Sequence, residues 1–298
     1  MIEPIEDQEA DSIEKQVAAK KSTLVSVVIN IGLTISQVLA GVISGSQGLI
    51  ADGIHSLTDL VADFVVLFAN HHSSKEADDD HHYGHQRYET AASLFLGVSL
   101  LAVGLGMLWK AGEKIIDPVS PGQIQIMALY VALGSLLAKE LLFRFMLSVA
   151  ERVRSSMLIA NAWHARSDAA SSLVVAVGIG GALLGYPILD SVGALVVGLM
   201  VAKAGWGFSW DALHDLMDRA VSEEEHQKIE AIIKSTVGVQ GFHDLRTRKM
   251  GDMILVDVHI EVDRHLSVQV GHDVALNARN QIMKELPVLD VMTHIDPV

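Results

Sequence analysis

Long apolar runs separated by short polar segments occupy most of the chain. A helix needs about 20 consecutive apolar residues to cross the hydrocarbon core of a bilayer. Six stretches approach that length: Ser22 to Ile43, Gly48 to Asn70, Ala91 to Lys110, Ile124 to Leu147, Leu158 to Leu184 and Ile188 to Phe208. The pattern predicts an α-helical membrane protein with six transmembrane helices over residues 22–209, preceded by a cytoplasmic tail at residues 1–21.

The pattern becomes that of a soluble domain after about Trp210. Ser222 and Glu225 have the spacing of a capping box, which predicts a helix running to about Thr236. Apolar and polar residues then alternate from Ile254 to Asp263, as in a strand with one buried face. His259 is expected on the face away from the core.

Three further elements complete this C-terminal region. They are strands at Phe242 to Arg248 and at Val288 to Asp296, and a helix from Ser267 to Leu286. The order helix, strand, strand, helix, strand predicts a small cytoplasmic α+β (αββαβ, metallochaperone-like) domain with two layers over residues 210–298.

Two of the apolar stretches contain matched pairs of histidine and aspartate. His55 with Asp59, and His164 with Asp168, are four residues apart and lie on one face of a helix. A charged side chain at the centre of a membrane helix costs at least about 2.5 kcal/mol, so such residues usually have a function. Together the pairs offer two nitrogen and two oxygen ligands, which suits tetrahedral Zn²⁺. The alternative is that each pair is a hydrogen-bonded contact between helices.

Other polar residues in the apolar stretches are expected to have structural rather than transport roles. Lys139, Glu140 and Arg144 are close to the end of the fourth stretch, where snorkelling is favoured over an intramembrane role. Three more residues lie about one turn from the His/Asp pairs. These residues, which are Asp52, Asp63 and Asn161, either tune the ligands through hydrogen bonds or bridge helices, and bridging is favoured.

Composition narrows the function further. Half of the 298 residues are hydrophobic, as expected for a polytopic membrane protein. The net charge of -14, without an evident basic patch, argues against binding of nucleic acid. Because cysteine is absent, any metal ion must be held by His, Asp and Glu.

Basic residues in the short connections indicate the orientation of the helices. Most of them fall on the side of the N-terminus, in the segments before the first stretch, after the second and after the fourth: Lys20, Lys21, Lys75, Arg87, Arg152 and Arg154. The positive-inside rule therefore places both termini in the cytoplasm.

The fourteen histidines are clustered rather than scattered. Asp78, His81 and His85 in the loop after the second stretch have spacings that suit a metal ion, although a solvated loop is an equal alternative. The C-terminal domain contributes residues that could share one sheet edge as one or two metal sites: His243, His259, His272, His294 and Asp296.

In these motifs the chain resembles the cation diffusion facilitators, and most of all the bacterial zinc and iron transporters of that family. The resemblance covers nearly the whole length. It rests on the six apolar stretches, the two His/Asp pairs, the Asp78/His81/His85 loop, Leu216-Met217-Asp218-Arg219-Ala220, His243-Asp244-Leu245-Arg246-Thr247-Arg248 and His294-Ile295-Asp296-Pro297.

The resemblance implies a role for each group of residues. The His55/Asp59/His164/Asp168 quartet would be the transport site, the Asp78 loop an intermediate cytoplasmic site, and the C-terminal cluster a paired-metal site near a homodimer contact. Arg87 and Asp218 match a charge interlock between membrane helices and cytoplasmic domain, although this chain has Gln86-Arg87 where the family usually has Gly-Lys. Glu76 also replaces a common Pro, and His55 replaces the Asp of some relatives.

The favoured function is export of Zn²⁺ from the cytoplasm in exchange for protons by a homodimer, in a bacterial inner membrane. The His/Asp set favours Zn²⁺ because imidazole replaces a hard oxygen ligand. Alternatives are export of Fe²⁺, Co²⁺, Mn²⁺ or Cd²⁺ by the same mechanism, or a membrane metal sensor or scaffold without transport. An intramembrane zinc enzyme is disfavoured because four protein ligands leave no open position for water.

Overall fold

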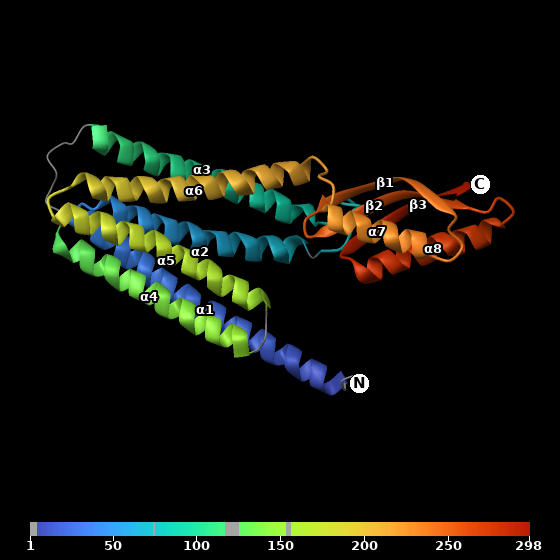
Figure 1. Cartoon of the computed structure of the whole chain (residues 1–298), viewed down its shortest axis with the longest axis horizontal. Coiled ribbons are helices and arrows are strands. Elements are labelled where there is room, and N and C mark those ends of the chain that lie inside the picture. Colours follow the sequence, from blue (N-terminus) through green and yellow to red (C-terminus); the bar gives the residue numbers. More distant parts are fainter. Residues whose placement is uncertain (1–4, 74, 117–124, 153–155) are drawn as a thin grey trace. The chain divides into compact units, whose positions relative to one another are not determined.

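The computed structural model describes residues 5–73, 75–116, 125–152 and 156–298. The loop residue Arg154 lies outside this part of the chain. Six long helices come first (Figure 1): α1 (Ile5–Ser44), α2 (Gln47–Ser73), α3 (Arg87–Ile116), α4 (Ile126–Arg152), α5 (Ser156–Leu183) and α6 (Ile188–Leu216). The chain forms two compact units, residues 1–64 with 98–206 and residues 65–97 with 207–298.

The helical membrane architecture predicted from the apolar stretches is confirmed. Four of the described helices are long and apolar enough to cross a membrane: the Leu24–Ser44 part of α1, and α3, α4 and α6. Helices α2 and α5 contain the His/Asp pairs and have comparable lengths of 27 and 28 residues.

Two helices extend beyond the apolar stretches that predicted them. Helix α1 begins at Ile5 rather than near Ser22, because the polar residues before Ser22 are rich in the helix formers Glu, Lys, Gln and Ala. Helix α6 continues past Phe208 to Leu216. Arg219, just beyond α6, bonds Asp215 at 2.6 Å and Asp211 at 2.9 Å. These ion pairs lie along the surface of the last turns of α6.

A buried carboxylate of α6 holds the N-terminus of α2. Asp190, 1% exposed, accepts hydrogen bonds from the Ser46 hydroxyl at 2.5 Å and from the backbone N–H groups of Gln47 at 2.7 Å and Gly48 at 3.2 Å. The first N–H groups of a helix have no partner within the helix, and a negative charge there is favourable. The start of α2 is therefore fastened to α6.

The C-terminal region forms a three-stranded sheet covered by two helices. Its elements are α7 (Glu223–Ser235), β1 (Gly241–Met250), β2 (Met253–Val262), α8 (Val268–Glu285) and β3 (Val288–Pro297). The strand order is β1-β2-β3, with β1 antiparallel and β3 parallel to β2. A parallel pair requires a crossover, which α8 provides. The predicted α+β domain is confirmed.

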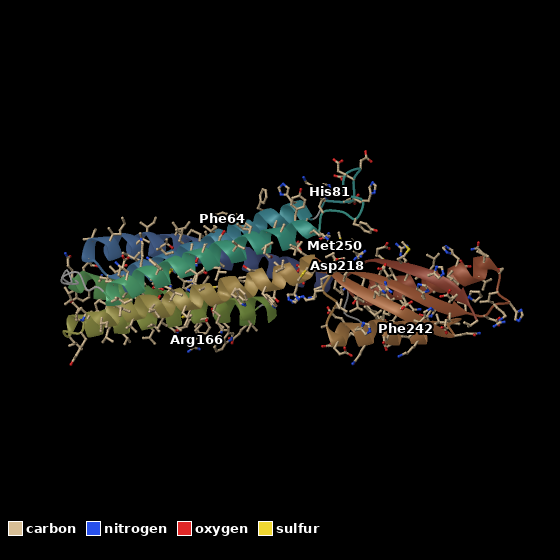
Figure 2. The ribbon with its side chains drawn as sticks, turned by 90° about the horizontal axis from the view of Figure 1, so that it is seen from above. Phe64, His81, Arg166, Asp218, Phe242 and Met250 are labelled. Carbon is tan, nitrogen blue, oxygen red and sulfur yellow. The ribbon has the colours of Figure 1, made fainter. Side chains whose placement is uncertain are left out.

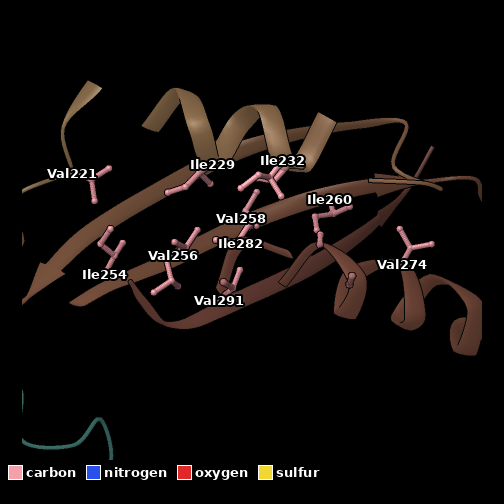
Figure 3. Packing of buried hydrophobic residues seen from close by; sticks show 14 of the residues in the cluster. Val221, Ile229, Ile232, Ile254, Val256, Val258, Ile260, Val274, Ile282 and Val291 are labelled. Carbon is pink, nitrogen blue, oxygen red and sulfur yellow. The ribbon is translucent and has the colours of Figure 1, made fainter. Parts of the chain in front are cut away.

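One face of this sheet forms the hydrophobic core (Figure 3). The alternating residues of β2 that were predicted to be buried, such as Val256 and Ile260, pack against Ile229 and Ile232 of α7 and Ile282 of α8. Because successive side chains of a strand point to opposite faces, the polar residues of β2 lie on the other face. That face is free to carry functional side chains.

Candidate metal centres

Ligands from α2 and α5 meet within the first unit. His55, Asp59 and Asp168 each place a possible ligand atom within 4.8 Å of the others. His55 Nδ1 lies 3.6 Å from Asp59 Oδ2, as expected for residues one turn apart. The two helices thus bring one imidazole and two carboxylates to one point, a charge of -2 that matches a divalent cation when both carboxylates are ionised.

The fourth predicted member, His164, lies one turn before Asp168 on α5. Its side chain is outside the described part of the structure, as are the side chains of Asp63 and Asn161. The four-residue spacing on α5 keeps the prediction that His164 shares a face with Asp168. Three of the four predicted residues are therefore observed together.

A second polar cluster next to these ligands was not predicted as a unit. Asp52 of α2 is fully buried and Lys139 of α4 is 4% exposed, with Lys139 Nζ 3.4 Å from Asp52 Oδ1. The interpretation of Lys139 as a snorkelling residue is wrong, because its ammonium pairs with a carboxylate inside the helix bundle. Arg144 is exposed and bonds Glu140 at 2.9 Å, and snorkelling of these two residues stays a prediction. Asp52 bridges helices as expected.

The loop between α2 and α3, in which Figure 2 labels His81, gathers the second predicted set. Asp78 Oδ1 lies 3.3 Å from His81 Nδ1, and Asp78 Oδ2 lies 3.4 Å from His85 Nε2. Backbone hydrogen bonds in both directions between Asp78 and His81 close the turn, and Gly84 adopts a positive φ of 79° that suits glycine. The three side chains could hold one metal ion.

The local hydrogen bonds prepare this loop for a cation. Partial desolvation raises the pKa of the Asp78 carboxyl, but hydrogen bonds from the backbone of His81 and Asp80 and the nearby His85 outweigh it and lower the pKa. His85 is buried, and its Nδ1 lies 3.1 Å from the carbonyl oxygen of Glu76. A proton on Nδ1 would leave the Nε2 lone pair directed to Asp78 and available to a metal.

The third set lies across the polar face of the sheet. The strand register places His243 opposite His259, and His259 opposite His294, so three imidazoles form one row. Neighbouring ring centroids are 4.9 and 4.6 Å apart. His243, His259 and Asp296 have ligand atoms within 4.8 Å of one another.

Hydrogen bonding and charge around Asp296 favour its ionised form. His259 Nδ1 lies 2.9 Å from one carboxylate oxygen, and His294 Nε2 lies 3.4 Å from the other. The hydrogen bond from His259, together with the charges of the neighbouring histidines, lowers the pKa of Asp296 below its ordinary value. An ionised carboxylate flanked by imidazoles is a suitable ligand set for a divalent metal ion.

The sheet site differs from the prediction in three members. His272, which is exposed on α8, and His294 are both outside the group of three that lies within ligand distance, although His294 Nε2 lies 3.4 Å from Asp296. Glu261, which was not predicted, joins the site, since His243 Nδ1 lies 3.1 Å from its carboxylate. The signal was available, because Glu261 follows His259 by two residues and so shares its face of the strand.

The charge pair implied by the resemblance also forms. Arg87, the first residue of α3, donates to Asp218 Oδ1 at 2.7 Å. Asp218, labelled in Figure 2, is the second residue after the end of α6. Both side chains are largely exposed, so the pair contributes little stability by itself. Its position fixes the start of α3 against the segment that leads into the C-terminal domain.

Both parts of the chain match families of known proteins. Residues 23–217 match the family described as the cation efflux transmembrane domain, and residues 221–298 match the cation efflux protein, cytoplasmic domain. The chain belongs to the cation diffusion facilitator family. As a member of this family it is an integral membrane transporter of divalent metal cations rather than an enzyme.

Relatives of the cation diffusion facilitator align along most of the chain. Metal tolerance protein C1 of Arabidopsis thaliana is 37% identical over 90% of this chain, which spans only 60% of that protein. The magnetosome protein MamB of Magnetospira sp. strain QH-2 is 36% identical, with 91% of this chain and 92% of MamB covered. The manganese efflux system protein MneS of Bacillus subtilis is 31% identical over 94% and 96% of the two chains.

Solved structures resemble the C-terminal region. The metal-bound C-terminal domain of the CzcD transporter from Thermotoga maritima is 27% identical, with 25% of this chain and 87% of that domain covered and a TM-score of 0.24.

Proposed function

We propose that this transporter exports Zn²⁺ from the cytoplasm in exchange for protons, with His55, Asp59, His164 and Asp168 as the transport site. The convergence of His55 and Asp59 of α2 with Asp168 of α5 is the observation that carries the proposal. Two imidazoles and two carboxylates form a tetrahedral set that suits Zn²⁺ better than ions preferring six oxygen ligands.

Proton exchange follows from the chemistry of the ligands. A metal ion binds neutral imidazole and ionised carboxylate, so metal binding releases protons and protonation releases the metal. If α2 and α5 expose the site alternately to the two sides of the membrane, zinc leaves the cytoplasm as protons enter. We expect a bacterial inner membrane with both termini in the cytoplasm.

The two outer clusters receive supporting roles in this proposal. The Asp78/His81/His85 loop would be an intermediate site on the cytoplasmic side. The sheet cluster, with His243, His259, His272, His294 and Asp296, would bind regulatory metal and draw two copies of the domain together as a homodimer. The match of residues 221–298 to the family's cytoplasmic domain supports this assignment.

Export of Mn²⁺ or Fe²⁺ is the second candidate. Two relatives are described as a manganese efflux protein and a magnetosome protein, and they cover nearly the same length as this chain. The nitrogen ligand His55 favours zinc over manganese, since carboxylate and carbonyl oxygens suit Mn²⁺ better.

The test is metal-driven proton flux in liposomes that contain the purified protein. We expect saturable zinc flux with opposing proton movement, reduced at least 100-fold by Asp59→Asn with Asp168→Asn. Glu140→Gln is the matched control, because it also neutralises a carboxylate of a membrane helix but bonds Arg144 instead of facing the site; its flux should stay within twofold.

Each other result has a definite meaning. Full flux in the double variant would exclude the quartet as the transport site. Zinc binding without flux in the unmodified protein would favour a sensor or scaffold. Faster flux of Mn²⁺ or Fe²⁺ than of Zn²⁺ would show that the faster ion, and not zinc, is the substrate.

A further inference from the structure

The strongest unexplained feature of the membrane unit is the buried ion pair of Asp52 and Lys139. Their side chains are 0% and 4% exposed, and the charged atoms are 3.4 Å apart. Burying two charges away from water is expensive even when they are paired, and ionisable residues inside membrane helices usually serve a function. A role merely in helix association would not need charged groups.

The Asp52 carboxylate is surrounded by hydrogen-bond donors. It accepts from Gln37 at 2.5 Å, Ser172 at 2.6 Å and Lys139 at 3.4 Å, and the Ser171 oxygen lies 3.1 Å from it. Donors thus occupy three of the about four lone-pair positions of the carboxylate. Asp52 and Lys139 also cancel each other's charge. The cluster therefore leaves the charge of the neighbouring ligand set unchanged.

The cluster lies one helical turn from the ligands, at the same contact between α2 and α5. Asp52 precedes His55 by three residues, while Ser171 and Ser172 follow Asp168 by three and four. At 1.5 Å per residue, these separations are about 4.5 to 6 Å along the helix axes. The hydrogen bond from Ser172 to Asp52 joins α2 directly to α5 at that level.

The cluster also touches the ligand-bearing turn of α5. Lys139 Nζ lies 3.4 Å from the backbone oxygen of Asp168, and the Ser171 hydroxyl lies 2.7 Å from the same atom. The carbonyl of a ligand residue is thus held by α4 and by the next turn of α5. A displacement of α5 relative to α2 would have to stretch several of these buried contacts together.

We propose that Asp52, Lys139 and Ser172 are positioning residues that set the spacing between α2 and α5 and thereby select among divalent cations. The inference rests on the proposed transport site. A tetrahedral zinc site requires ligand atoms at about 2.0 to 2.2 Å from the ion, whereas Mn²⁺ prefers an octahedral set of oxygens that needs more room. A looser contact between α2 and α5 should therefore favour manganese.

The decisive variant is Ser172→Ala, with Ser46→Ala as a matched control. Both hydroxyls are fully buried and donate to a carboxylate, Ser172 to Asp52 at 2.6 Å and Ser46 to Asp190 at 2.5 Å. Ser46 is about 13 Å from the level of His55 along α2. We expect Ser172→Ala to lower the ratio of zinc to manganese transport, each as Vmax/KM, at least threefold. Ser46→Ala should leave the ratio within 1.5-fold, because Asp190 keeps its hydrogen bonds from the backbone N–H groups of Gln47 and Gly48.

The ratio of the two ions does not depend on how much protein is folded. A second variant, Asp52→Asn with Lys139→Met, removes both charges together and should change the ratio in the same direction by at least tenfold. Equal loss of zinc and manganese transport in both variants would show a purely structural role and overturn the proposal. If the quartet is not the transport site, Asp59→Asn with Asp168→Asn will retain flux. That result would overturn the proposed function, whereas an unchanged ratio of zinc to manganese transport would overturn only the present inference.

Discussion

At the scale of single residues, the identity of one ligand controls the chemistry of the proposed transport site. His55 supplies an imidazole, so this site contains a softer ligand than a site of oxygens alone. His55→Asp should lower zinc transport relative to manganese transport about tenfold, measured as the ratio of Vmax/KM in liposomes. An unchanged ratio would mean that ligand type does not set selectivity here.

Residue chemistry was also the most predictable part of the sites. Histidine and aspartate four residues apart on a helix must share a face, so the pairing of His55 with Asp59 follows from the sequence alone. The partners of Asp52 do not, because Gln37, Lys139 and Ser172 come from three other helices. Their approach depends on helix packing, which residue spacing within one helix cannot report.

At the scale of elements, the capping box of α7 gives a pH-dependent contribution to stability. The Ser222 hydroxyl and backbone N–H both bond the Glu225 carboxylate, at 2.6 and 2.9 Å, and these bonds lower the pKa of Glu225 below its ordinary value. A group with a depressed folded pKa stabilises the fold above its ordinary pKa, and this stabilisation is lost as the pH falls through the folded value.

Ser222→Ala should therefore destabilise α7 by about 1 kcal/mol at pH 7. We expect hydrogen-exchange protection of residues 223–235 in the full-length protein to fall about fivefold, with a smaller difference below about pH 4, where Glu225 begins to accept a proton in the unfolded chain. Ser235→Ala, at the other end of α7, is the control. A difference that persists at low pH would argue against the carboxylate as its origin.

Strands and helices of the C-terminal domain were predicted within a few residues because periodicity is a local property. The alternation of apolar and polar residues predicts β2 regardless of its neighbours. The outward position of His259 was predicted, but its direct alignment with His243 and His294 depends on strand register, which the pattern within one strand does not give. A shift of one residue between strands would turn one of these imidazoles to the opposite face.

At the scale of the whole molecule, the metal loop belongs with the C-terminal domain rather than with the bundle. Glu89 of α3 accepts hydrogen bonds from Ser73 at 2.6 Å and from the backbone of Asp252, in the β1–β2 turn, at 3.2 Å. Gly251 in that turn has a positive φ of 63°, and a Cβ there would lie 2.8 Å from the Gln86 oxygen. These contacts join segments far apart in sequence, which hydropathy could not predict.

The two strands that this turn connects carry His243 and His259 of the sheet cluster. If metal binding there regulates transport, His259→Ala with Asp296→Ala should raise the KM for zinc at least threefold while leaving Vmax within twofold. His226→Ala, on the surface of α7, is the control. If the double variant binds fewer zinc ions per protein but keeps the same KM, metal binding by this domain does not regulate transport.

The fastening of α2 to Asp190 has a mechanical consequence. A rod held at one end moves as a lever, with a displacement that grows with distance from the fulcrum. Measured from Gly48, His55 and Asp59 are about 10 and 16 Å along α2, so a tilt of about 5° would shift them by roughly 1 and 1.5 Å. Such shifts are large compared with the tolerance of a metal site, and a small angular change would suffice to release an ion.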